Sequence, residues 1–197
     1  MAQLLLAGLA TTTMLMFVAW LISLPLRNVA VVDIFWGPAV ASAVLAAFLG
    51  SVPGERGSLA VLLAVLWAVR LALHIFWRSR GQPEDRRYRE IRARNEPHFG
   101  FKSLYLVFGL QAVLATIIAL PLLGAATSSA PLGPLDLLAV ALWLAGFIIQ
   151  AAAALQMARF QQRPGAAHVC WALLAGGQSA AVDDGEPGGT AGRPMLD

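Results

Sequence analysis

The stretch MAQLLLAGLATTTMLMFVAWLISL (residues 1–24) opens the chain with an apolar run long enough to cross a lipid bilayer. A helix needs about 20 apolar residues to span roughly 30 Å of hydrocarbon. The stretch has no basic residue and is too long for the apolar region of a signal peptide. We therefore interpret it as a first transmembrane helix, and the fold depends on whether similar runs follow.

Four further apolar runs follow, at about 29–50, 58–77, 103–125 and 135–157. The segments between the runs carry Pro, Gly or polar residues, which are typical of helix connections. Only 13% of the 197 residues are charged and the mean hydropathy is +0.69, whereas a soluble domain carries about 25% charged residues. The sequence therefore predicts an all-α polytopic bundle with five transmembrane spans, within a domain of residues 1–164.

The basic residues are unevenly distributed along the chain. Of the fourteen Lys and Arg residues, eight lie between Arg78 and Lys102. With five spans, the first and third loops and the tail share one side of the membrane and hold twelve of the fourteen. The positive-inside bias therefore places the N-terminus outside, and the loop 78–102 and the C-terminal tail in the cytoplasm. We expect these arginines to meet the anionic headgroups of the lipid bilayer and expect no nucleic-acid partner.

Several polar side chains fall inside the predicted spans, where an unpaired ionisable group is costly. They are Asp33, Arg70, His74, Gln111, Gln150 and Gln156. Counting residues from the span ends places them in the cytoplasmic half, with Asp33 and Arg70 at similar depth. We predict an Asp33–Arg70 ion pair and a polar cavity that opens to the cytoplasm. The alternatives are a purely structural pair and, for each Gln, an interhelical hydrogen bond.

The charged loop contains PEDRRYREIR (83–92), which mixes acids with bases. Glu84 and Asp85 could begin a short interfacial helix, because acidic residues favour a helix N-terminus. Glu90 is spaced to pair with Arg86 and Arg94 on such a helix. Tyr88 would then face either the membrane surface or a ligand, and a simply solvated helix remains the alternative.

Five motifs occur in one order along the chain. They are VVDIFWG (31–37), LLAVLWAVRLALHIFWR (62–78), EDRRYREIR (84–92), LPLL (120–123) and LQMARF (155–160). Together, over about residues 29–164, they resemble a bacterial membrane family related to the steroid 5α-reductases (3-oxo-5-alpha-steroid 4-dehydrogenases). The resemblance implies a multi-pass protein of the bacterial inner membrane with about seven spans, which moves hydride from NADPH to an enone-type C=C bond of a lipid or sterol-like substrate.

The resemblance also implies roles for individual residues of this chain. Asp33, Arg70 and Tyr88 match catalytic positions, and no metal site is implied. The residues that match cofactor-binding positions are Glu84, Asp85, Arg87, Gln150, Gln156 and Arg159. An acid beside the substrate carbonyl would polarise the enone.

Two departures from the family pattern shape the functional expectation. Helix five carries Gln150 and then Ala154, where relatives have a cofactor-binding Asp. The Gly- and Ala-rich tail 165–197 contains no Arg-His-Pro-Asn-Tyr-x-Gly motif, so we expect a disordered tail and a truncated or frameshifted chain that is inactive as written. An isoprenylcysteine-type membrane methyltransferase and a non-catalytic membrane protein remain the alternatives.

Overall fold

The computed structural model describes residues 2–161, and the tail predicted at 165–197 lies outside them. In the described residues the chain consists of helices and their connections, without a β-strand. Residue contacts divide the chain into two compact units, Met1–Gln150 and Ala151–Asp197. The packing described below belongs to the first unit.

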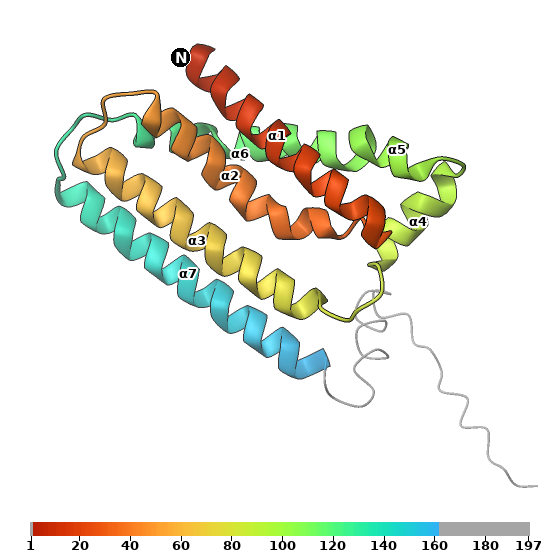
Figure 1. Cartoon of the computed structure of the whole chain (residues 1–197). Helices are drawn as coiled ribbons and strands as arrows, with labels where there is room; N and C mark the ends of the chain where they lie inside the picture. Colours follow the sequence, from red (N-terminus) through yellow and green to blue (C-terminus); the bar gives the residue numbers. More distant parts are fainter. Residues whose placement is uncertain (1, 162–197) are drawn as a thin grey trace, which may run out of the picture. The chain divides into compact units, whose positions relative to one another are not determined.

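Five helical segments in the described range are long and apolar enough to cross a membrane, which confirms the predicted spans. They are α1 (Ala2–Leu26), α2 (Val31–Leu49), α3 (Glu55–Ser79), a composite helix, and α7 (Pro134–Gln161), whose end lies in the second unit (Figure 1). The composite helix joins α5 (Phe99–Ser103), a π-helical segment η1 (Leu104–Gly109) and α6 (Leu110–Ala126). A shorter helix, α4 (Arg86–Asn95), lies in the charged loop.

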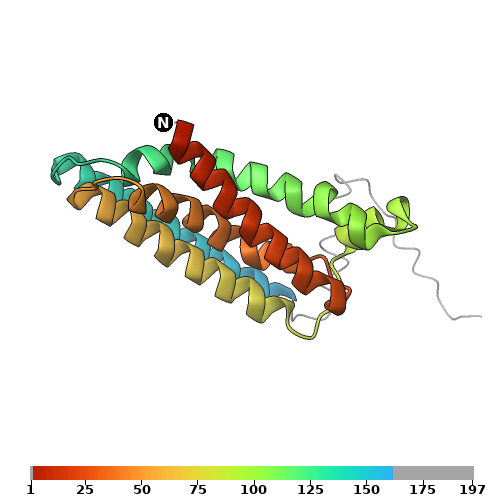
Figure 2. The same cartoon turned by 45° about the horizontal axis from the view of Figure 1, so that its top comes forward.

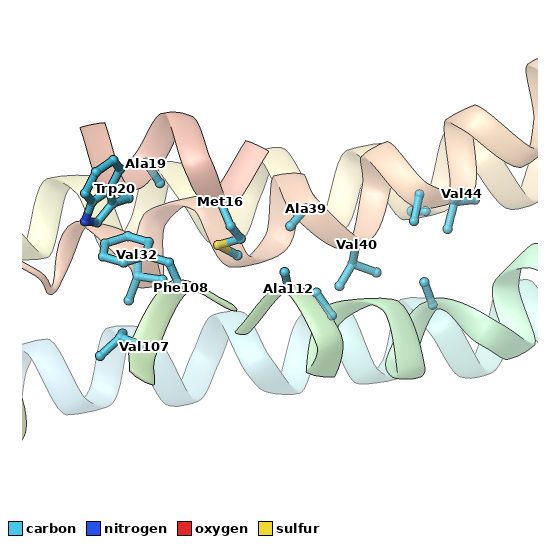
Figure 3. Packing of buried hydrophobic residues seen from close by; sticks show 14 of the residues in the cluster. Met16, Ala19, Trp20, Val32, Ala39, Val40, Val44, Val107, Phe108 and Ala112 are labelled. Carbon is cyan, nitrogen blue, oxygen red and sulfur yellow. The ribbon is translucent and has the colours of Figure 1, made fainter. Parts of the chain in front are cut away.

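The core forms where α1, α2 and α6 meet, and small side chains dominate it. Figure 3 shows residues of these helices and of η1 pointing toward one another. The buried residues include Met16, Ala19, Ala39, Val40, Ala43, Val44, Phe108, Ala112, Ala115 and Ala119. Apolar burial does not drive association inside lipid, so small residues stabilise the bundle by letting helices approach closely. A buried hydrogen bond of 2.8 Å between Thr12 and Thr116 also joins α1 to α6.

Glycines allow α3 to approach its neighbours. A Cβ atom on Gly37 would lie 3.1 Å from the Ala68 carbonyl oxygen, and one on Gly57 would overlap the Ala126 carbonyl oxygen. The starts of α3 and α7 lie at the same end of the bundle, where Gly54 N donates to Ser128 O at 2.9 Å. Over Pro134–Gln150, α7 lies alongside α3 (Figures 1 and 2).

Helix α4 begins where the acidic residues predicted a helix N-terminus. Asp85 is its N-cap, and its Oδ1 accepts a hydrogen bond from Arg87 N at 3.0 Å. The predicted pair between Arg86 and Glu90 is confirmed at 2.8 Å. Tyr88 is buried whereas most arginines of α4 are exposed, so the helix turns one face toward the bundle.

Candidate functional site

The candidate site centres on Asp33, in the first turn of α2. Tyr88 of α4 donates a hydrogen bond of 2.8 Å from its hydroxyl to Asp33 Oδ1. Arg87 Nη2 lies 3.7 Å from Asp33 Oδ2, which is an ion pair without a close hydrogen bond. The sequence therefore brings together two catalytic candidates, Asp33 and Tyr88, and the cofactor candidate Arg87, across more than fifty positions of chain.

The charged loop stabilises this arrangement electrostatically. Burial raises the pKa of the Tyr88 phenol well above its ordinary value, and the negative charge of Asp33 raises it further. Burial would also raise the pKa of Asp85, but hydrogen bonds from the Arg87 side chain and backbone outweigh it, so the Asp85 pKa is lowered. The hydrogen bond to Asp85 raises the pKa of the Arg87 guanidinium. Asp85 therefore orients the Arg87 guanidinium beside Asp33.

A pocket of about 450 Å³ lies against this cluster, within the size range of small-molecule sites. Its lining comes from α2, α3, α4 and α6: Asp33, Trp36, Leu71, His74, Ile75, Arg78, Arg87 and Gln111. Trp36 Nε1 donates to Gln111 Oε1 at 2.6 Å, so the Gln111 oxygen is occupied and its amide N–H groups are left to donate. Guanidinium and amide donors thus meet one carboxyl group beside apolar walls. This chemistry suits a ligand with a carbonyl or phosphate oxygen on an apolar body.

The predicted gathering of polar residues from separate spans is confirmed for Asp33, His74 and Gln111. The predicted Asp33–Arg70 ion pair is wrong. Arg70 Nη1 instead donates to Gln150 Oε1 at 3.2 Å, and its guanidinium carbon lies 5.0 Å from the centre of the Phe147 ring. Depth along the membrane normal placed Asp33 and Arg70 together but could not show which faces of α2 and α3 they occupy, nor that α4 reaches Asp33.

The other predicted cofactor residues have different surroundings. Both Glu84 oxygens bind Arg92, at 2.9 and 3.0 Å, and Oε1 also accepts from Val29 N at 2.8 Å. Through these contacts, Glu84 and Arg92 join the start of α4 to the connection between α1 and α2. Gln156 and Arg159 lie in the last turns of α7, within the second unit. Of the predicted cofactor set, Arg87 lines the pocket and Asp85 supports it.

Sequence reasoning missed Arg78 as a site residue and placed it only in the charged loop. Arg78 is the last basic residue of α3 and lies four residues after His74. Helical spacing places the two on one face, so this signal was present in the sequence. Arg78 and Arg87 together bring two cations to one pocket, which suits a phosphate group. Among the described residues that line this pocket, Arg78 and Arg87 are the groups whose charge matches a phosphate.

Comparisons with known proteins identify a family match over most of the chain and a relative that matches over a short stretch. Residues 19–172 match the family described as proteins of unknown function (DUF1295). An IMPACT family member from Haemophilus influenzae is 51% identical over 41 residues, which cover 18% of this chain and 20% of that protein. The chain thus spans about a fifth of the length of this relative. No solved structure was found to match the chain.

Proposed function

The chain belongs to the DUF1295 family of proteins of unknown function, and we propose that its bundle holds a lipid or sterol-like substrate for NADPH-dependent reduction of a C=C bond. The observation that carries the proposal is the convergence of Asp33, Arg87 and Gln111 on one pocket with apolar walls. An enone reduction needs donors at the carbonyl oxygen, which gains negative charge as hydride reaches the double bond. The five motifs that resemble the steroid 5α-reductases support the same reaction class.

Each residue has a separate role in this proposal. The Gln111 amide donates to the substrate carbonyl. The Asp33 carboxylate, which accepts from the Tyr88 hydroxyl and pairs with Arg87, positions the donors around the carbonyl, and Tyr88 acts through Asp33 as a positioning residue. Arg78 and Arg87 would receive a cofactor phosphate. NADPH, when bound, supplies the hydride. Arg70 bonds Gln150 and does not line this pocket, so we give it a role in joining α3 to α7.

Ligand binding tests the substrate role. The full chain, purified in detergent, is titrated with a lipid-like α,β-unsaturated ketone while the change in tryptophan fluorescence is followed, and a Trp36→Phe variant identifies the part of the change that comes from the pocket. We expect saturable binding that weakens about tenfold or more in Asp33→Asn, because the neutral amide loses the ion pair with Arg87 and the charge that Tyr88 bonds, and a hydrogen bond to a charged group contributes about 1.5–3 kcal/mol. Glu90→Gln is the control, because Glu90 lies on the exposed face of α4. Equal binding by wild type, Asp33→Asn and Glu90→Gln would contradict the proposal.

Cofactor titrations separate the reaction classes. NADPH binding that weakens in Arg87→Gln but not in Arg94→Gln, an exposed arginine of the same helix, would support the reductase. Binding of S-adenosylmethionine without NADPH would instead favour the methyltransferase alternative. Binding of neither, with ketone binding absent as well, would favour a non-catalytic membrane protein.

A further inference from the structure

A second cavity of about 470 Å³ lies between α2, α3, α6 and α7, and the proposed reaction does not use it. Its walls are almost entirely apolar: Val40, Leu59, Ala60, Leu63, Ala64, Trp67, Ile118, Leu122, Ala125, Ala139, Val140 and Trp143. The exceptions are Arg56 and Asp136. An apolar cavity of this size is within the range of ligand sites.

Polar contacts join α3 to α7 at one end of this cavity and beyond its other end. At one end Arg56 Nε and Nη2 bind the two Asp136 oxygens at 2.8 and 2.9 Å. Beyond the other end, Arg70 donates to Gln150. The two contacts are fourteen residues apart on each helix, so α3 and α7 run parallel and in register. On α3 the lining of this apolar slot runs from Arg56 to Trp67, which at 1.5 Å per residue is about 16 Å and close to the roughly 15 Å thickness of one leaflet of hydrocarbon.

The apolar slot begins one helical turn from the polar pocket on both α2 and α3. Trp36 lines the pocket and Val40, one helical turn later on α2, lines the slot. On α3, Leu71 lines the pocket, and Trp67, one turn earlier, lines the slot. Residues four positions apart share a helix face, so both cavities lie on the same faces of α2 and α3.

We propose that the slot between α3 and α7 binds the linear apolar chain, acyl or isoprenoid, of a substrate whose polar head lies at Asp33. This inference rests on the proposed function and names its substrate class. A linear chain can extend from the polar pocket along the shared helix faces, whereas a compact ring system fills one cavity at most. The Arg56–Asp136 pair closes the far end, because a methyl terminus cannot replace two hydrogen bonds of a bidentate ion pair.

Chain length provides the first test. The purified full chain is titrated in detergent with short-chain and long-chain ketones that share one enone head, without NADPH. Ala139→Phe fills the slot, and Ala145→Phe is its control on an exposed position of α7 that does not line it. We expect Ala139→Phe to weaken binding of the long-chain ketone about tenfold, which corresponds to the loss of contact with roughly two methylene groups. Binding of the short-chain ketone should be unchanged. Equal effects on both ketones, or on both variants, would overturn the proposal.

Photolabelling of the wild-type chain gives a second test that depends on no variant. A long-chain ketone with a diazirine at its terminal carbon should label peptides of α3 and α7 that contain Leu59, Leu63, Ala139 or Val140. Labelling confined to α1 or α4 would overturn the proposal. Neither readout needs the cofactor, so failure of NADPH to bind would count against the reductase while leaving the length dependence intact.

Discussion

Tyr88 and Asp33 are joined by a hydrogen bond of 2.8 Å between elements fifty-five positions apart. The bond connects α4, in the most basic loop of the chain, to the start of the second spanning helix. Glu84 and Arg92 add a second connection beside it. The charged loop is therefore part of the packed structure, and its removal would change the site around Asp33.

Tyr88→Phe should destabilise the folded protein by about 1–3 kcal/mol, because Asp33 loses its close donor in a partly buried position. Thermal unfolding in detergent measures this change. Tyr105→Phe is the matched control, since Tyr105 is 64% exposed. If both variants unfold at the wild-type temperature, the hydrogen bond does not contribute to stability.

Alkaline pH should weaken the same connection. Burial and the Asp33 charge raise the Tyr88 pKa above its ordinary value of 10.0, so the folded state binds the phenol proton more tightly than the unfolded state. The resulting stability is fully present below pH 10.0 and is lost as the pH rises above that value toward the folded pKa. In the Tyr105→Phe background, where Tyr88 is the remaining tyrosine, phenolate absorbance should appear well above pH 10.0 and together with loss of structure. Phenolate at the ordinary pH in an intact fold would contradict this expectation.

Glu84→Ala should lower the free energy of unfolding by about 2 kcal/mol or more, because it leaves Arg92 and the Val29 N–H without their shared acceptor. The Glu84 side chain is only 10% exposed. Glu90→Ala removes a pair in which both side chains are at least half exposed, and exposed pairs contribute about 1 kcal/mol or less. Chemical unfolding measures the free energy of unfolding of both variants. Equal decreases would show that the buried contacts of Glu84 contribute no more than the exposed pair of Glu90.

Gly57→Ala should destabilise the bundle by about 1–3 kcal/mol, because the new Cβ atom would overlap the Ala126 carbonyl oxygen where α3 meets α6. Gly124→Ala is the matched control, since a Cβ atom there meets nothing within 4 Å. Thermal unfolding in detergent should separate the two substitutions. Similar unfolding temperatures would mean that α3 and α6 lie further apart than described.

The spans and α4 could be predicted because their signals are local. An apolar run of about 20 residues needs no knowledge of its neighbours to be recognised as a membrane helix. Asp85 caps the start of α4 by accepting a hydrogen bond from Arg87 N, two residues later in the chain. This contact is local, so the start of the helix could be predicted from the sequence. The side of the membrane on which each loop lies stays a prediction from the distribution of Lys and Arg.

The partners of the polar residues could not be predicted in the same way, because they depend on how the helices are rotated about their axes. Asp33 and Arg70 share a depth but bind Tyr88 and Gln150 instead. The Trp36–Gln111 hydrogen bond joins residues 75 positions apart, and nothing local in the sequence indicates it. Depth alone was enough to group Asp33, His74 and Gln111, which line one pocket, but not to assign their partners.

The most direct measurement of the central claim is the carbonyl stretching frequency of a bound enone, isotopically labelled at its carbonyl carbon and observed by infrared difference spectroscopy. Donors around Asp33 should shift the stretch in the wild-type protein below its frequency in detergent alone, and Asp33→Asn should remove much of that shift. A bound enone with the same frequency as in detergent, in both proteins, would contradict the placement of its carbonyl in this pocket.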